Sequence, residues 1–319
     1  MHILILGYSQ IVRRRVIPAL GGLKDFSRVD IAFWGPDAPA ERPVTPNGRL
    51  FEDFAPALAQ SEAELVYVST VNSAHAEWVR KALESGRHVC VDKPAFLSLK
   101  DAEAAADLAS RKGLCLAEAT VYASHPQIAA VQGLFAPPNA GPLRLTVLFS
   151  VPPFPPENFR YEKKLGGGAL YDMGPYAASV SRLILADRPD EVLCRINSRR
   201  GGDGVETSFS VLASYSGGRS FAGHFGFDTE YKNYLNVLGP DRSVEMNRVF
   251  TTPADLPNEI KVREKNEGRV VKIPAADSFA LFLDRLREEI KAKTQGRWIE
   301  LMLKDADLLD SLRRAALRE

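Results

Sequence analysis

The sequence predicts a doubly wound α/β domain followed by an α+β domain. In the first third of the chain, short apolar strands alternate with helical segments, which is typical of a parallel sheet covered by helices on both faces. Beyond about residue 120, longer runs alternate apolar and polar residues, which indicates an antiparallel sheet with one covered face. The length of 319 residues fits two domains, which we place at 1–120 and 121–319.

Each element follows from a local pattern of apolar residues and turn residues. The first domain is expected to hold strands at 3–6, 30–34, 64–69, 88–92 and 114–117, with helices at 12–20, 75–84 and 99–112. Gly86 and Gly113 follow the last two helices, as glycine commonly does at a helix end. The second domain is expected to hold strands at 143–151, 191–197, 207–214, 219–226 and 233–239, a helix at 174–186, and terminal helices at 278–293 and 299–318.

The strands of the second domain carry aromatic and branched residues on what we predict to be an uncovered face of the sheet. These residues are Phe209, Val211, Phe221, Phe225 and Phe227. A large apolar face that water would otherwise contact usually marks an interface between subunits. We therefore expect a homodimer or homotetramer that forms through this sheet.

Composition excludes several classes of protein. Lys plus Arg total 41 and Asp plus Glu total 40, so there is no electrostatic case for nucleic acid or an anionic membrane as a partner. No transmembrane helix and no secretory signal peptide is expected. Cys90, Cys115 and Cys194 are isolated, as expected for reduced thiols of a cytoplasmic protein. No metal-ligand spacing and no G-x-S-x-G motif occurs, so we expect neither a metal nor hydrolase chemistry.

The turn after the first strand is a partial match to the dinucleotide-binding pattern G-x-G-x-x-G/A. Gly7 can form the tight turn, whereas Ser9 and Val12 stand where small residues are usual. The helix that follows offers free backbone N–H groups to a phosphate, near Gln10 and Ile11. The alternative is an ordinary strand-to-helix turn with a solvated basic face, since three arginines follow at 13–15.

The end of the second strand leaves the choice between NAD and NADP open. This position usually carries the group that reads the adenosine ribose, and here it has neither a carboxylate nor an arginine. Asp37 or Arg42 could substitute for it.

Three later segments form a recognisable set. They are VSTVNSAH at 68–75, VDKP at 91–94 and GGGALYDMGPY at 166–176. Together they resemble the Gfo/Idh/MocA oxidoreductases, the family of glucose–fructose oxidoreductase and inositol dehydrogenase. Ala117-Glu118-Ala119, the run from Tyr122 to Gln127, and Asn158-Phe159-Arg160 fit the same resemblance.

The resemblance implies a Rossmann domain, a C-terminal domain with an open, mainly antiparallel sheet, NAD or NADP as cofactor, and a sugar or cyclitol as substrate. It implies that Lys93, Tyr176 and Asp172 are catalytic. The expected cofactor contacts are Gly7, Ser9, Gln10, Ile11, Thr70, Asn72, His75, Asp92, Lys93 and Glu118. The expected substrate contacts are Lys93, Tyr122, Asn158, Arg160, Asp172 and Tyr176.

The residue types suit hydride transfer to or from a carbonyl group. A phenol can donate the proton that the carbonyl oxygen needs, and an ammonium group stabilises negative charge on that oxygen. Pro94 favours an extended backbone at Lys93, at the end of a strand. The structural alternatives are a solvated Lys93, a core Tyr176, and helix caps at Asp172 and Asn72.

The sequence thus predicts an NAD(P)-dependent oxidoreductase that transfers hydride between nicotinamide and a secondary alcohol or ketone of a sugar, sugar derivative or cyclitol. Two alternatives stay open. The incomplete glycine pattern at Ser9 and Val12 fits a catalytically inactive nucleotide-binding regulator or partner protein. A lyase or glycosidase that uses NAD transiently is possible on the same fold.

Overall fold

The computed structural model describes residues 1–33, 47–200 and 204–318. The chain forms two compact units, one of Met1–Thr120 with Phe279–Leu303 and the other of Val121–Ser278 with Lys304–Glu319. Residues 279–303, which the sequence analysis assigned to the second domain, therefore belong to the first unit. Side-chain contacts hold residues 279–303 against the first unit, since Arg287 pairs with Asp25 at 3.2 Å and Arg15 lies over the ring of Phe279.

The first unit contains a six-stranded parallel sheet, as predicted. Its order is β3 (Leu50–Phe51), β2 (Arg28–Ala32), β1 (His2–Leu6), β4 (Leu65–Val68), β5 (His88–Val91) and β6 (Leu116–Glu118). Residues 3–6 of β1 are fully buried, which explains their continuous apolar run. The strand order reverses between β1 and β4, and ligands of doubly wound sheets bind beyond the strand ends at this point.

Helices follow most strands of this unit. They are the π-helical turn η1 (Val12–Val16), α1 (Ile17–Gly22), α2 (Phe54–Gln60), η3 (Asn72–Ala74), α3 (His75–Glu84), α4 (Leu99–Arg111) and α8 (Ser278–Ala292). The helix at 75–84 was predicted with its observed bounds. The sequence analysis missed β3 and α2, because a two-residue strand and a seven-residue helix carry too little periodicity to be recognised.

The second unit contains an eight-stranded sheet in which β7 and β10 form the single parallel pair among the described strands. Its order is β14 (Glu267–Ile273), β13 (Asn258–Glu264), β12 (Arg242–Asn247), β11 (Lys232–Leu238), β7 (Arg144–Ser150), β10 (Arg219–Gly226), β9 (Val205–Tyr215) and β8 (Glu191–Arg200). This is the expected open, mainly antiparallel sheet. The strands β12–β14 were missed because charged residues dominate their exposed positions.

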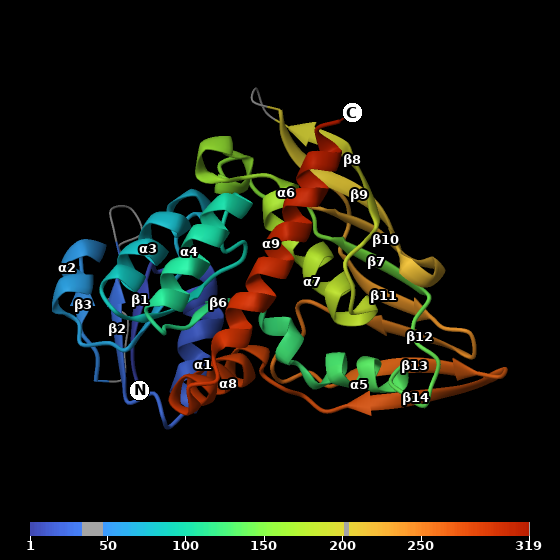
Figure 1. The fold of residues 1–319 in the computed structure, drawn as a ribbon, viewed down its shortest axis with the longest axis horizontal. Helices are drawn as coiled ribbons and strands as arrows, with labels where there is room; N and C mark the ends of the chain where they lie inside the picture. Colours follow the sequence, from blue (N-terminus) through green and yellow to red (C-terminus); the bar gives the residue numbers. More distant parts are fainter. Residues whose placement is uncertain (34–46, 201–203, 319) are drawn as a thin grey trace. The chain divides into compact units, whose positions relative to one another are not determined.

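Helices cover one face of this second sheet. Figure 1 shows α5 (Pro126–Leu134), α6 (Ala169–Asp172), α7 (Gly174–Leu185) and the end of α9 (Gly296–Ala316) on the same side of the strands. Contacts of α7 with β7 and β10, and of α6 with β9, place the apolar core between these two layers.

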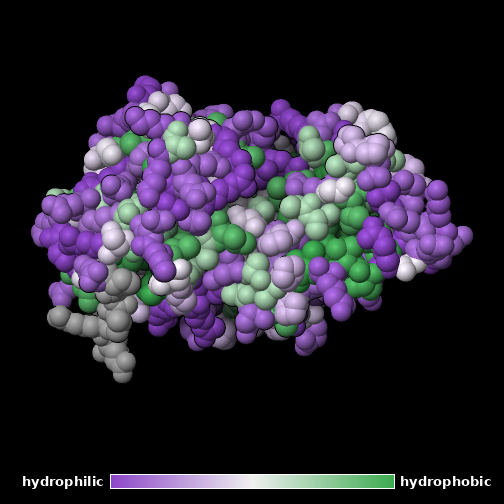
Figure 2. Space-filling model, turned by 90° about the horizontal axis from the view of Figure 1, so that it is seen from below, coloured by the Kyte–Doolittle hydropathy of each residue, from purple (hydrophilic) through white to green (hydrophobic). Residues whose placement is uncertain are grey.

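The residues expected to form an uncovered apolar face are inside this core. Phe209, Val211, Phe221, Phe225 and Phe227 are at most 4% exposed, because the chain's own helices cover them. That expectation about these five residues was wrong. The opposite face carries Leu193 and Leu212, which are 56% and 52% exposed and lie opposite each other on β8 and β9. In the view of Figure 2, the visible hydrophobic surface gathers over the second unit.

Among the described residues, no helix has the length and apolar character that crossing a membrane requires.

Burial lowers the pKa of several histidines below its usual value, namely His2, His75, His88 and His125. His88 shows why the folded chain favours the neutral ring, since its Nδ1 accepts the backbone N–H of Cys115 at 2.9 Å. In the unfolded chain these rings take up protons near pH 6.5, whereas the folded chain resists protonation. The free energy of unfolding therefore falls as the pH drops below about 6.5.

We predict that His88→Asn reduces this acid sensitivity. The Asn Oδ1 can accept the Cys115 N–H without titrating, so stability near pH 7.5 should change little. Between pH 7.5 and 5.5 the variant should lose less of its free energy of unfolding than the native chain, by no more than about 1 kcal/mol. Urea denaturation at the two pH values measures this. An equal or steeper loss in the variant would show that His88 does not contribute.

Candidate cofactor and active-site residues

Gly7 forms the tight turn between β1 and the first helix. Its φ is +105°, and a Cβ atom there would lie 2.1 Å from the carbonyl oxygen of Ser69. Only glycine lets the two strand ends approach this closely. Gln10 and Ile11 follow at the exposed start of the helix, with Ile11 38% exposed. This arrangement fits the phosphate groups of a dinucleotide, which bind at helix N-termini beyond a parallel sheet.

Ser9 makes contacts within the protein. Its Oγ accepts the backbone N–H of Val12 at 3.2 Å, as a helix-capping side chain does, and lies 2.8 Å from Oγ of Ser69. The helix start thus keeps an ordered cap although the second glycine of the fingerprint is absent.

Hydrogen bonds hold the loop that carries Lys93 at Asp92, before the lysine, and at Ala95, after it. The Asp92 carboxylate accepts hydrogen bonds from the hydroxyl of Tyr67, at 2.6 Å, and from that of Ser69. The backbone N–H of Ala95 donates to Oε2 of Glu118 at 2.8 Å. Lys93 itself is half-buried at the carboxyl end of β5. The surrounding strands therefore restrict the backbone that presents its ammonium group.

The ring of His75 lies inside the first unit and connects two loops at the end of the sheet. The ring is fully buried, its Nδ1 lies 2.8 Å from the carbonyl oxygen of Pro94, and its Nε2 lies 3.1 Å from that of Thr70. It thereby ties the Lys93 loop to the loop after β4. This differs from the expected cofactor contact, because burial leaves no ring atom accessible.

Two other residues of the loop after β4 were expected to contact the cofactor. Asn72 is buried and begins η3; it does not cap α3, whose preceding residue is Ala74 with no capping side chain. The helix-cap interpretation of Asn72 is therefore wrong. Thr70 is half-buried, and its hydroxyl donates to the carbonyl of Val71 at 3.3 Å.

Asp172 forms a buried ion pair with Arg160 in the second unit. Nε of Arg160 donates to Oδ2 of Asp172 at 2.8 Å, and the two side chains are 25% and 8% exposed. Burial opposes the charge of Arg160, but the Asp172 carboxylate outweighs it and raises the pKa of the guanidinium. Asp172 ends α6 and does not cap α7, so the helix-cap interpretation is also wrong here.

Asn158 holds Arg160 from the other side. Its Oδ1 accepts the backbone N–H of Arg160 at 3.1 Å and caps the short helix η5 (Phe159–Tyr161). The guanidinium also lies over the ring of Phe154, 4.6 Å from its centroid. Asn158, Arg160 and Asp172 thus form one connected polar group, as the sequence motifs suggested for a substrate site.

Tyr176 lies in the first turn of α7 and is half-buried. Its ring packs edge-on against Phe149, with centroids 4.9 Å apart, and lies 5.0 Å from Phe250. Tyr122 also packs nearby, at 6.0 Å, but it is only 2% exposed and its hydroxyl lies 2.8 Å from Oγ of Ser179. Tyr122 therefore supports the position of the Tyr176 ring and does not present a hydroxyl to substrate, contrary to the expectation.

The sequence analysis missed residues that hold these groups in place. Tyr67 appeared there only as part of a strand, Ser69 only within the strand and the 68–75 motif without a role of its own, and Glu206 did not appear. The Glu206 carboxylate fills the space beside Gly168, where a Cβ atom would lie 2.4 Å from Oε1. Burial raises the pKa of this carboxyl. The alternation of β9 does place Glu206 outside the apolar positions, but no local motif indicates its partner.

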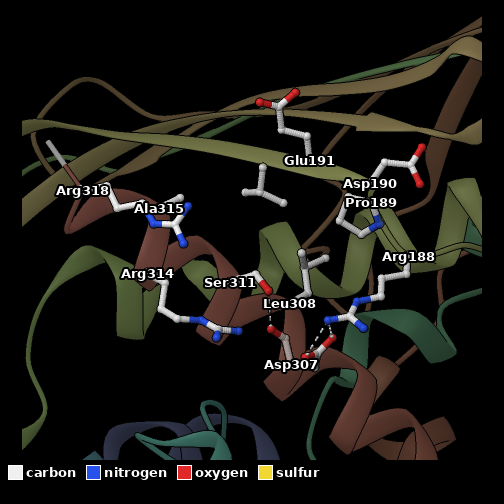
Figure 3. A pocket seen from close by; sticks show the side chains of 11 residues that line it. Arg188, Pro189, Asp190, Glu191, Asp307, Leu308, Ser311, Arg314, Ala315 and Arg318 are labelled. Atoms are coloured by element: carbon white, nitrogen blue, oxygen red, sulfur yellow. Dashed lines mark hydrogen bonds and ion pairs between the residues drawn. The ribbon is translucent and has the colours of Figure 1, made fainter.

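A groove elsewhere in the second unit has a volume of about 470 Å³ and lies between the start of β8 and the end of α9. Figure 3 shows Arg188 and Asp307 paired across it, at 3.1 Å. Acidic and basic side chains are balanced there, and none of its lining residues is a predicted site residue. It is therefore a surface feature separate from the candidate site.

Comparisons with known proteins agree with these observations. Residues 1–120 match the model of an oxidoreductase family with an NAD-binding Rossmann fold, and residues 141–245 match the GFO/IDH/MocA C-terminal domain. A dTDP-3,4-didehydro-2,6-dideoxy-alpha-D-glucose 3-reductase from Saccharopolyspora spinosa is 30% identical over 98% of this chain and 96% of its own. A D-xylose 1-dehydrogenase (NADP(+)) from Haloferax volcanii is 32% identical, over 67% of this chain and 65% of its own.

Among solved structures, a 3-ketoreductase from Actinomadura kijaniata in complex with NADP and TDP-benzene superimposes with a TM-score of 0.90. It is 28% identical and the match covers 99% of this chain and 98% of that one.

We predict that Arg160→Met destabilises the protein by about 2–3 kcal/mol at pH 8. The change leaves the buried Asp172 carboxylate without its guanidinium, and the loss stays below the full cost for buried pairs because Arg160 is 25% exposed. Adding Asp172→Asn should restore at least half of the loss. Arg111→Met is the matched control, since its pair with Asp107 is 68% and 61% exposed and should contribute less than about 1 kcal/mol. Equal losses in the two single variants, measured by urea denaturation, would contradict the prediction.

Proposed function

This chain belongs to the Gfo/Idh/MocA family and is an NAD(P)-dependent oxidoreductase of sugar hydroxyl and keto groups; on that premise, we propose that it reduces a ketone of a nucleotide-linked deoxysugar with NADPH. The observation that carries the proposal is the similarity to a dTDP-ketosugar 3-reductase, which extends over 98% of this chain at 30% identity. The 3-ketoreductase structure with bound NADP and TDP-benzene supports the same substrate class and cofactor.

The two alternatives have less support. The named relatives are reductases and dehydrogenases, which favours a redox reaction with net consumption of the cofactor. The incomplete glycine fingerprint, which suggested an inactive protein, is compensated at Ser9 by a capped helix start.

The turn from Gly7 to Ile11 would hold the pyrophosphate, through the exposed amides at the helix start. When bound, the nicotinamide supplies or accepts the hydride. NADP is the proposed form because the ketoreductase and the xylose dehydrogenase use it. The candidates for reading the ribose, Asp37 and Arg42, lie outside the described residues.

The chain's own residues would manage the proton and the substrate hydroxyls. In the reducing direction, the Tyr176 hydroxyl donates a proton to the carbonyl oxygen as negative charge develops there. The Lys93 ammonium group stabilises that charge. Asp172, held by Arg160, accepts a hydrogen bond from a neighbouring sugar hydroxyl and fixes the orientation of the ring.

A cytoplasmic location is part of the same proposal. It is supported by Cys90, Cys115 and Cys194, which are all buried free thiols, as is usual in a reducing compartment.

The direct test is oxidation of NADPH by the purified protein with a panel of dTDP-linked 3-ketosugars, each compared with the free sugar and with NADH. The proposal expects turnover that depends on both the nucleotide and NADPH. Equal rates with free sugars would contradict the nucleotide-linked substrate, and faster turnover with NADH would contradict the cofactor choice.

We predict that Lys93→Met and Tyr176→Phe each lower kcat by roughly 10²–10⁴, because each removes a group that handles charge or the proton in the transition state. Dissociation constants for NADPH, measured by fluorescence titration, should change far less for Tyr176→Phe than kcat does. The matched controls are Lys100→Met and Tyr231→Phe, which alter exposed residues outside the site. Near-native kcat in either site variant would refute that residue's role.

We also propose that two copies of the chain associate through the exposed face of the second sheet. Leu193 and Leu212 are more than half exposed and adjacent, which is an unusual position for large apolar side chains in a sheet. The variant Leu193→Glu/Leu212→Glu should sediment as a monomer at micromolar concentration, whereas Leu317→Glu, 83% exposed near the C-terminus, should not change the assembly. A native chain that is already monomeric would overturn this proposal.

A further inference from the structure

Three neighbouring strand ends of the first sheet are joined by a chain of hydroxyl groups. Ser9 follows β1, Ser69 follows β4 and Asp92 follows β5, and these strands are adjacent in the sheet. Oγ of Ser9 lies 2.8 Å from Oγ of Ser69, and Ser69 in turn donates to the Asp92 carboxylate. Ser69 is 2% exposed, so water cannot readily replace these partners.

The hydrogen bonds of this chain can run in only one direction. A carboxylate accepts hydrogen bonds, so the single proton of the Ser69 hydroxyl is committed to Asp92. The Ser9 hydroxyl must therefore donate to Ser69, and its oxygen accepts the N–H of Val12. As a result, the Ser9 hydroxyl has no proton left for a phosphate oxygen.

The acceptor at the end of this chain is the residue next to Lys93. The other oxygen of Asp92 is occupied by the fully buried Tyr67 hydroxyl, at 2.6 Å. With both oxygens engaged by hydroxyl groups, the carboxylate is held at the sheet edge. Its negative charge is shared with these donors, so it attracts the neighbouring ammonium group less strongly than an unengaged carboxylate would.

We propose that Ser9 and Ser69 are positioning residues for Lys93, and that the hydroxyl chain links the dinucleotide-binding turn to the loop that carries the reactive ammonium. Ser9 therefore stands at the second glycine position of the fingerprint for a reason other than cofactor contact. This inference rests on the proposed function for the role of Lys93, but the hydroxyl chain itself can be tested without turnover.

The kinetic experiment uses Ser69→Ala, Ser9→Ala and the double variant, with NADPH and the best ketosugar substrate. Ser69→Ala should lower kcat by about tenfold, which is less than the roughly 10²-fold that a 1 Å misplacement of a catalytic group can cost. The dissociation constant for NADPH should change less than threefold. Because both serines act through one chain, the double variant should resemble Ser69→Ala alone. Ser9→Thr keeps the hydroxyl and should therefore lose less kcat than Ser9→Ala.

The matched control is Ser98→Ala, which removes another capping serine that accepts a backbone N–H, here that of Asp101 at 3.1 Å. It should lower stability and leave kcat unchanged. Multiplicative losses of kcat in the double variant would overturn the single-chain arrangement. A large rise in the NADPH dissociation constant for Ser9→Ala, with kcat unchanged, would show that Ser9 acts in cofactor binding instead.

A second measurement separates this inference from the proposed function. The rate at which an amine-reactive reagent labels Lys93, followed by peptide mass spectrometry at fixed pH, requires no substrate. In Ser69→Ala the Asp92 carboxylate loses a donor and attracts the ammonium group more strongly, so Lys93 labelling should slow severalfold while labelling of Lys100 stays the same. If no ketosugar turns over but Lys93 labelling slows in Ser69→Ala, the hydroxyl chain stands and the proposed function fails. Unchanged Lys93 labelling would overturn the hydroxyl chain.

Discussion

The carboxylate of Asp92 is the fixed point of the first unit's candidate site. It accepts hydrogen bonds from the hydroxyl groups of Tyr67, in β4, and of Ser69, the residue after β4. These bonds fix the position of the backbone from which Lys93, the next residue, extends. Asp92 is half-buried, and a carboxylate that loses part of its hydration needs hydrogen-bond donors to replace it. Tyr67 and Ser69 supply these donors from β4 and from the residue that follows it. The loop at 92–95 therefore keeps one backbone path, with His75 and Glu118 holding its later residues.

In the second unit, an ion pair stabilises the buried carboxylate of the candidate site. Asp172 is 6% exposed, and Arg160 provides the opposite charge from a different segment of the chain. Asn158 and the aromatic ring of Phe154 restrict the guanidinium, so the acceptor that would orient a sugar hydroxyl is prepared before substrate arrives. In both units, few residues have an assigned chemical role, and most of the contacts around them restrict the movement of those few side chains. Such preorganisation is a general requirement of transition-state stabilisation.

The sequence allowed the fold class, the family and the main candidate residues to be predicted, because these depend on local patterns. Strands such as 65–68 are continuously apolar since both faces are buried, and the run around Asp172 and Tyr176 is contiguous. Tyr122 and His75 were assigned from the family resemblance, and the five apolar residues from Phe209 to Phe227 from the strand pattern. Their burial depends on which distant segments cover them, and no local pattern contains that information.

What the sequence by itself determined was the periodicity of the elements and the order of reactive side chains along the chain. Only the tertiary structure decided which hydroxyl groups meet Asp92, and that residues 279–303 return to the first unit. Ser9, Ser69 and Asp92 are separated by 60 and 23 positions in the chain, so no local pattern can indicate that they touch. They meet because parallel strands bring their carboxyl ends to one edge of a sheet, and hydrogen-bond partners across that edge are set by strand order and register.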